Sequence, residues 1–138
     1  MFSPPIYREQ LQPHERGPHT SKLFGIRFPL IVEPLTFESA SSISTDYDGG
    51  FWEFYTLCNG GSYMAPISGA SFRVICANGY KGELSADAFG VTACLYAFSL
   101  LSFDADHCLA EKCARQCHLL REYAAQHPQA AAIWRAID

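Results

Sequence analysis

Cysteine and histidine are the side chains of this sequence that could serve as metal ligands or nucleophiles. The chain has six cysteines and five histidines. Zinc sites are usually built from closely spaced pairs of ligands on turns, whereas Cys113 and Cys117 fall on one apolar helical stripe and His118 points about 100° away from Cys117. Free cysteine is often buried. We therefore predict that these thiols pack in the core and that the chain holds no metal and no cofactor.

Nucleophilic catalysis would need a cysteine or serine with a base in reach. The histidines fall in no recognised motif: His14, His19, His107, His118 and His127. The sequence also lacks G-x-S-x-G, a P-loop and G-x-G-x-x-G. We expect no catalytic residues and no enzymatic activity. A small cytoplasmic Cys/His-dependent enzyme of unknown substrate stays open as an alternative.

Acidic residues are concentrated in one part of the chain. The net charge is −4, and no lysine or arginine lies between Arg27 and Arg73. A duplex as long as the folded chain, roughly 35–40 Å, carries about twenty phosphates, against fourteen Asp and Glu here. Mimicry of DNA by charge is therefore weak, and no stable nucleic-acid binding is expected. A weak DNA-binding module that uses the N-terminal segment is a further alternative. The carboxylates of the acidic stretch are Glu33, Glu38, Asp46, Asp48 and Glu53.

This acidic stretch runs into a β segment that is aromatic on both alternating faces. Such a segment is either a surface for a ligand or partner, or a strand with helices on both sides. Asp46 and Asp48 can also be read as turn residues beside Gly49 and Gly50. We predict a partner-binding surface from the residues in which charge and aromatic rings come together: Asp46, Asp48, Trp52, Glu53, Tyr55 and Tyr63.

Strand patterns come first and helix patterns second. Strands are predicted by β-favouring residues separated by tight turns, and helices by apolar periodicity, caps and first-turn prolines. This order predicts a single α+β domain in which an antiparallel sheet of three to four strands, with a central hairpin, packs against segregated helices. The expected strands are 51–58, 62–67, 71–77 and 80–84, and the expected helices are 34–43, 85–102, a helix from 104 or 106 to about 124, and a short one after Pro128.

The first 22 residues are rich in proline and charge and show no apolar period, so we predict an extended or flexible arm over 1–22 and a domain over 23–138. No basic segment followed by an apolar run opens the chain, which predicts a cytoplasmic protein with reduced cysteines. The longest uncharged apolar run is 88–103. It is shorter than the roughly 20 residues of a membrane span, so we expect a buried helix and no membrane contact.

Several motifs, in order, resemble those of the ArdB/KlcA antirestriction family. The resemblance covers nearly the whole chain from about residue 23. It departs from the family at Cys58, where serine is expected, and at Ser62, where an aromatic residue is expected. The motifs are YDGGFWEFY (47–55), NGG (59–61), YMAP (63–66), GELSADA (82–88), LREYA (120–124), HP (127–128) and AID (136–138).

The resemblance implies a small cytoplasmic protein, carried by plasmids and other mobile elements, that protects incoming DNA from type I restriction-modification systems. It implies an α+β fold, no enzymatic activity and no convincing imitation of DNA. The expected partner is the type I restriction-modification complex or an associated host factor. The resemblance leaves open whether restriction is blocked directly or indirectly.

Overall fold

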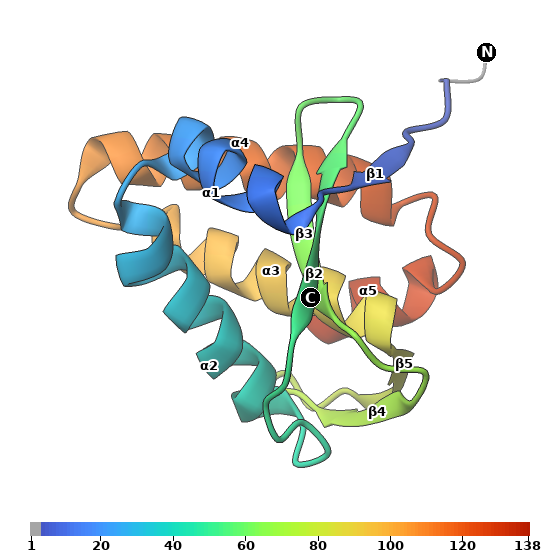
Figure 1. Cartoon of the computed structure of the whole chain (residues 1–138). Helices are drawn as coiled ribbons and strands as arrows, with labels where there is room; N and C mark the ends of the chain where they lie inside the picture. Colours follow the sequence, from blue (N-terminus) through green and yellow to red (C-terminus); the bar gives the residue numbers. More distant parts are fainter. Residues whose placement is uncertain (1–3) are drawn as a thin grey trace.

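The computed structural model describes residues 4–138. Over this range the chain forms five α-helices, a π-helical segment and five strands in two antiparallel sheets (Figure 1). The predicted α+β class is confirmed. In chain order the elements are β1 (Arg8–Gln10), α1 (Pro13–Phe24), η1 (Phe28–Val32), α2 (Glu33–Ile43), β2 (Trp52–Leu57), β3 (Ser62–Pro66), β4 (Ser71–Ile75), β5 (Lys81–Ser85), α3 (Ala86–Leu101), α4 (His107–Ala124) and α5 (Ala130–Ile137).

The four predicted strands divide between two sheets instead of forming one. The central hairpin is β2–β3, in which Tyr55 lies opposite Tyr63. Its turn uses Gly60 at φ 94°, a conformation that favours glycine, and the side-chain oxygen of Asn59 accepts a hydrogen bond from the Gly61 N–H. The second hairpin, β4–β5, pairs only with itself among the described residues. The third strand of the first sheet is β1, which sequence patterns did not predict.

The expectation of an extended or flexible arm over 1–22 is wrong for most of that segment; residues 1–3 of it lie outside the described residues. β1 pairs antiparallel with β2, and α1 follows directly. A capping box explains the start of α1, because the Glu15 carboxylate accepts a hydrogen bond from the Gln12 N–H at 2.8 Å. Pro13 takes the first helical position, where its missing N–H costs no hydrogen bond. Tertiary pairing and capping therefore order this segment despite its prolines.

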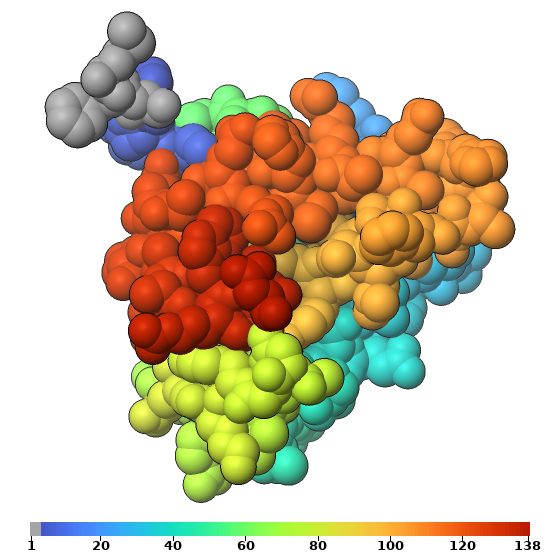
Figure 2. All heavy atoms as spheres, turned by 180° about the vertical axis from the view of Figure 1, so that it is seen from behind, coloured from blue at the N-terminus to red at the C-terminus, as the bar shows by residue number. Residues whose placement is uncertain are grey.

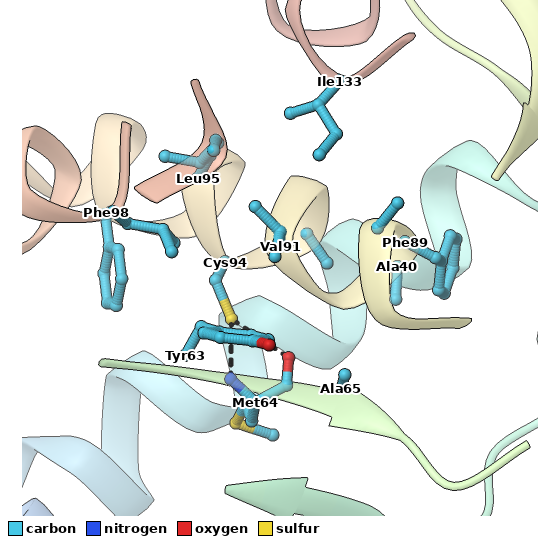
Figure 3. Close-up of a cluster of buried hydrophobic side chains, with 14 of the residues drawn as sticks. Ala40, Tyr63, Met64, Ala65, Phe89, Val91, Cys94, Leu95, Phe98 and Ile133 are labelled. Atoms are coloured by element: carbon cyan, nitrogen blue, oxygen red, sulfur yellow. Dashed lines mark hydrogen bonds between the residues drawn. The ribbon is translucent and has the colours of Figure 1, made fainter. Parts of the chain in front are cut away.

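Helix α3 lies at the centre of the molecule. The Ser85 hydroxyl caps its start by accepting a hydrogen bond from the Ala88 N–H, as its sequence predicts. The helix packs against α2, α4, α5 and β3, so nearly all its faces are buried (Figure 1). Close contact with β3 requires Gly90, because a Cβ there would lie 2.4 Å from the Cα of Ala65. Figure 3 shows the same contact one turn further on, where Cys94 is hydrogen-bonded to the backbone of Met64.

The remaining helices begin and end close to their predicted bounds. α2 covers the predicted helix after Pro34, and α4 begins after Asp106, whose carboxylate accepts hydrogen bonds from two backbone N–H groups. α5 begins after Gln129, one residue past Pro128. In Figure 2 the red α5 lies against the end of α4 and above the yellow-green β4–β5 hairpin. None of the helices within residues 4–138 has the length and apolar character needed to cross a membrane.

Candidate functional site

Helical residues contact one face of the aromatic strand β2, whereas the rings on its other face pack beside those of the neighbouring strand β3. On one face Trp52 contacts Phe37 of α2, with ring centroids 5.3 Å apart, and Phe54 contacts Phe28 of η1. On the other face Tyr55 stacks on Tyr63, at 4.9 Å. The structure therefore combines parts of the two interpretations left open by the sequence: Trp52 is buried in the core, whereas Glu53, Phe54 and Tyr55 remain partly exposed.

The six residues predicted to bind a partner do not form one continuous surface. Trp52 and Tyr63 are each only 3% exposed, so a partner cannot touch more than their edges. Asp46 and Asp48 lie in the loop that precedes β2, at the open end of the hairpin. Tyr55 lies within β2, three residues after its first residue, Trp52. Of the two loop carboxylates, Asp48 is the exposed one.

The acidic stretch is partly neutralised by arginines from outside it. Arg73 of β4 binds the Asp46 carboxylate, with Nη2 2.6 Å from Oδ1. Its hydrogen bonds lower the pKa of Asp46 to about 2. Arg16 of α1 lies 2.8 Å from Glu53 and approaches the ring of Phe54. The local negative patch is therefore smaller than the sequence indicates.

A polar cluster centred on Asp87 joins four elements of the fold. Asp87 Oδ1 accepts hydrogen bonds from the Tyr63 hydroxyl at 2.8 Å and from Arg8 Nη1 at 2.5 Å. Its Oδ2 lies 2.8 Å from Nε2 of His127. Burial opposes the charge on Asp87, but the hydrogen bonds from His127 and Tyr63 and the charge of Arg8 outweigh it and hold the pKa of Asp87 below its ordinary value. Asp87 is therefore an anion in the folded protein at neutral pH.

The imidazole of His127 has both ring nitrogens engaged. Nδ1 accepts a hydrogen bond from the Gln129 N–H at 3.0 Å, so the ring carries its proton on Nε2 and donates it to Asp87. A histidine held this way has no free nitrogen with which to take a proton from a substrate. The Asp87–His127 pair therefore positions the loop after α4 and does not form the base of a catalytic triad.

Aromatic rings extend this cluster across the sheet. The Arg8 guanidinium lies 4.3 Å from the centroid of the Tyr55 ring, Tyr55 stacks on Tyr63, and Tyr63 stacks on Tyr123 at 5.5 Å. Burial raises the pKa of Tyr63, so its hydroxyl remains a hydrogen-bond donor to Asp87. We call this set the Asp87 cluster: Arg8, Tyr55, Tyr63, Asp87, Tyr123 and His127.

Only two members of this cluster, Tyr55 and Tyr63, are among the site residues predicted from the sequence. Asp87 lies in the first turn of α3, where a carboxylate also favours the helix start. Arg8 falls in the segment predicted to be an arm, and His127 falls in no recognised catalytic motif. The available signal was the pair of motifs at 82–88 and 127–128, since each contributes one of the bonded side chains.

Two buried thiols, those of Cys94 and Cys113, are poorly suited to nucleophilic chemistry. Burial raises the pKa of Cys94 to about 12 and that of Cys113 to about 12. Both residues lie in the core, as their apolar surroundings predict. Across residues 4–138 no group of three or more His, Cys, Asp and Glu side chains is placed to hold a metal ion.

The open end of the central hairpin carries exposed apolar side chains beside a free carboxylate. Phe51 is 85% exposed and Ile67 is 57% exposed, and the Ile67 N–H donates a hydrogen bond to the Phe51 carbonyl. Together with Asp48 they border a hollow of about 470 Å³. We call Asp48, Phe51 and Ile67 the hairpin-end surface. An exposed ring of this size beside a charge is a feature of protein interaction surfaces.

Comparison with known proteins gives matches over most of the chain. A family model described as antirestriction protein matches residues 45–138. Two Escherichia coli proteins named antirestriction protein KlcA are 40% and 44% identical to the chain over 117 and 108 residues. These alignments cover 83% and 77% of the chain and 82% and 74% of the two relatives.

A solved structure matches the whole fold. It is a structure of the KlcA and ArdB proteins, with a TM-score of 0.91 and 36% sequence identity, and the match covers 100% of this chain and 99% of that one. Those proteins are described as showing a novel fold and antirestriction activity against type I DNA restriction systems in vivo but not in vitro.

Proposed function

Because the chain belongs to the antirestriction protein family, we propose that it counteracts type I DNA restriction-modification systems in the cell and so protects incoming plasmid or mobile-element DNA. The observation that carries this proposal is the full-length match to the KlcA and ArdB structure, whose proteins have that activity in vivo. The proposed place of action is the cytoplasm, where incoming DNA meets restriction enzymes.

We further propose that the activity is not enzymatic. The support is chemical: the His127 ring is fully engaged by Asp87 and Gln129, and the thiols of Cys94 and Cys113 have raised pKa values. An inhibitor that works by binding needs a rigid surface instead of an activated group. The Asp87 cluster supplies rigidity, because it ties β1, β3, α3 and the segment after α4 together.

The proposed partner is a protein, either the type I restriction-modification complex or a host factor associated with it. Of the residues predicted from sequence, Asp48 is the most available for contact, because it is exposed in the loop before β2. Glu53 and Tyr55, which lie in β2, are partly exposed. Asp46 is ion-paired with Arg73, and the side chains of Trp52 and Tyr63 are buried. We therefore centre the partner surface on the hairpin-end surface, in which Phe51 and Ile67 add apolar contact area.

Plating of unmodified phage on a host with an active type I system tests the function. Expression of the chain is expected to raise plating, and Phe51→Ser combined with Asp48→Ala is expected to remove most of that protection. Phe103→Ser is the matched control, because Phe103 is 86% exposed and lies in the loop after α3, outside the hairpin-end surface. Unchanged plating by soluble, folded wild-type protein would reject the function. Equal loss in both variants would reject the surface only.

A cleavage assay with purified type I enzyme separates the two routes of action. Inhibition in that assay would establish direct binding to the enzyme. Protection in cells without inhibition in the assay would establish an indirect route through a host factor. The hairpin-end variant is carried through both assays, so that a surface needed only in cells is distinguished from one that contacts the enzyme.

A further inference from the structure

A second hollow, on another side of the molecule, is lined by basic side chains. It lies between α1, α4 and the tip of the β2–β3 hairpin, which are neighbours in Figure 1, and has a volume of about 470 Å³. α1 contributes His19 and Lys22, and α4 contributes Lys112 and Arg115. Within each helix the two residues are three positions apart, so they share a face. No carboxylate lines this hollow.

Three cations of this basic hollow have no acidic partner, a property that they share with Lys81, Arg121 and Arg135 elsewhere in the described part of the chain. Among residues 4–138, neither Lys22, Lys112 nor Arg115 forms an ion pair with a carboxylate. Glu111 lies four positions before Arg115 on α4, yet these two side chains do not form an ion pair either. Four other arginines do have a carboxylate partner: Arg8, Arg16, Arg27 and Arg73. In a chain with a net charge of −4, this gathering of unpaired positive charge is a distinct feature.

The side chain of His19 is affected by the positive charge of the hollow. Burial and the neighbouring charge of Lys22 lower the pKa of His19. Its Nε2 is buried and has no hydrogen-bond partner among the described residues. The charge of Lys22 is therefore close enough to the ring to disfavour protonation of His19.

The wall of the hollow is rigid where it meets the hairpin. Gln116 is 4% exposed, and its carboxamide donates to the Gly60 carbonyl at 3.2 Å and accepts from the Ser62 hydroxyl at 2.9 Å. Asn59 donates to the Leu119 carbonyl of α4 at 3.0 Å. The hairpin tip is therefore fixed to α4, and Arg115 extends beside it, close to Gly60.

We propose that the basic hollow is a binding site for a compact polyanion of linked phosphate groups. A terminal phosphate group carries about −1.5 to −2 charge near neutral pH, so two linked groups already match the combined charge of Lys22, Lys112 and Arg115. Arginine presents a planar fork that suits phosphate oxygens, and lysine adds mobile point charges. The volume lies within the roughly 300–1,000 Å³ of small-ligand sites.

Charge density favours phosphate over the other anionic ligands. In an extended acidic peptide, side chains on the same face are about 6.6 Å apart, so one hollow would receive only one or two carboxylates. A DNA duplex spreads one charge per about 1.7 Å along a rod, and it would lie across the rim without placing its charges inside. Of these three classes of anion, linked phosphates bring the most charge into the volume that the three cations surround.

Calorimetric titration of the full chain at low salt tests the proposal, with tripolyphosphate as the probe. Lys22→Gln, Lys112→Gln and Arg115→Gln, singly and together, are the test variants, and all three side chains are exposed, so folding is preserved. Each charge-assisted contact contributes about 1.5–3 kcal/mol, so each single change is expected to weaken binding roughly tenfold or more. Lys81→Gln with Arg135→Gln is the matched control, since both are exposed cations outside the hollow. It is expected to leave affinity unchanged.

Further probes identify the source of the phosphates and the outcomes that contradict the site. Binding of ATP as tight as that of tripolyphosphate, or tighter, supports the site and assigns it to nucleotides; weaker binding of ATP supports it and assigns it to inorganic polyphosphate. The proposal is overturned if tripolyphosphate does not bind, or if the triple variant binds it as the wild type does. Tighter binding of hexaglutamate or of a short DNA duplex, lost in the triple variant, would also overturn it, by assigning the hollow to an acidic protein or to DNA.

Discussion

Arg73 binds both carboxylate oxygens of Asp46, with Nε 2.9 Å from Oδ2 and Nη2 2.6 Å from Oδ1, and its backbone N–H donates to Oδ2 as well. The carboxylate thereby caps the outer edge of β4, because it occupies a backbone donor that has no strand partner on that side. The Ser44 hydroxyl does the same for the Arg73 carbonyl, at 2.6 Å. A residue expected to face a partner is thus engaged in closing a sheet edge.

Acid should remove the contribution of this pair to stability. The folded pKa of Asp46 is about 2 against an ordinary 3.8, so the pair stabilises the fold above pH 3.8 and its contribution is lost as the pH falls toward 2. Asp46→Asn should therefore be less stable than the wild type near neutral pH, with the difference closing at the acid end. Urea midpoints measured at intervals over this range check it. A difference that stays constant with pH would contradict the assignment.

Asp87→Asn should destabilise the chain by about 1–3 kcal/mol, because it leaves a buried donor unpaired. Asp87 accepts from Arg8, Tyr63 and His127, whereas an asparagine must turn an amide N–H toward at least one of these donors. Urea unfolding measures the loss. Asp48→Asn is the control and should change stability little, because Asp48 is exposed. Equal effects of the two substitutions would show that the Asp87 cluster adds nothing to the fold.

Gly90→Ala should cost about 1–3 kcal/mol through overpacking of α3 against β3. The new methyl group would lie 2.4 Å from the Ala65 Cα, and a backbone atom cannot be displaced cheaply. Gly17→Ala in α1 is the matched control, since nothing lies within 4 Å of its Cβ position. That change should cost less than Gly90→Ala, because helix propensity contributes up to about 1 kcal/mol in its favour and crowding is limited to the neighbouring Pro18. Thermal unfolding of the two variants side by side gives the comparison.

Cys58 and Cys108 are the exposed thiols and should react readily with a disulfide reagent in the folded protein. Cys94 and Cys113 should react only after denaturation, since burial raises the pKa of each to about 12. Cys58→Ser should retain protection in the plating assay, because a serine hydroxyl can accept the hydrogen bond that the Tyr7 N–H now donates to the Cys58 sulfur. Loss of protection in that variant would instead favour the Cys/His enzyme.

Local signals account for the parts of the fold that the sequence predicts well. Ser85 and Asp106 mark helix starts with their own side chains, and the glycines after Asn59 close the central hairpin within three residues. The helix over 13–24 escaped prediction because Pro18 lies inside it and its apolar residues are few. β1 escaped because a three-residue strand with exposed side chains has no pattern of its own and exists only through its pairing with β2.

The candidate site was harder to predict than the fold, because its bonds join residues far apart in the chain. Arg8 and Asp87 are 79 positions apart, and Arg73 is 27 positions from Asp46. Counting charge along the sequence treats Asp46 and Glu53 as uncompensated, whereas pairing across elements neutralises both. The basic hollow was not predicted for the same reason, since Lys22 of α1 and Lys112 of α4 are 90 positions apart in the sequence.

The outer strand β1 has a consequence for synthesis on the ribosome. The carboxamide of Gln126 holds the backbone of Ile6 at both its N–H and its carbonyl, at 2.8 and 2.6 Å, across 120 residues. This contact cannot form until residue 126 has left the exit tunnel, although Ile6 was among the first residues to emerge. β1 can pair with β2 earlier, because that pairing needs only residues up to 57, so the anchoring of the segment before β1 by Gln126 is a late step that follows strand pairing.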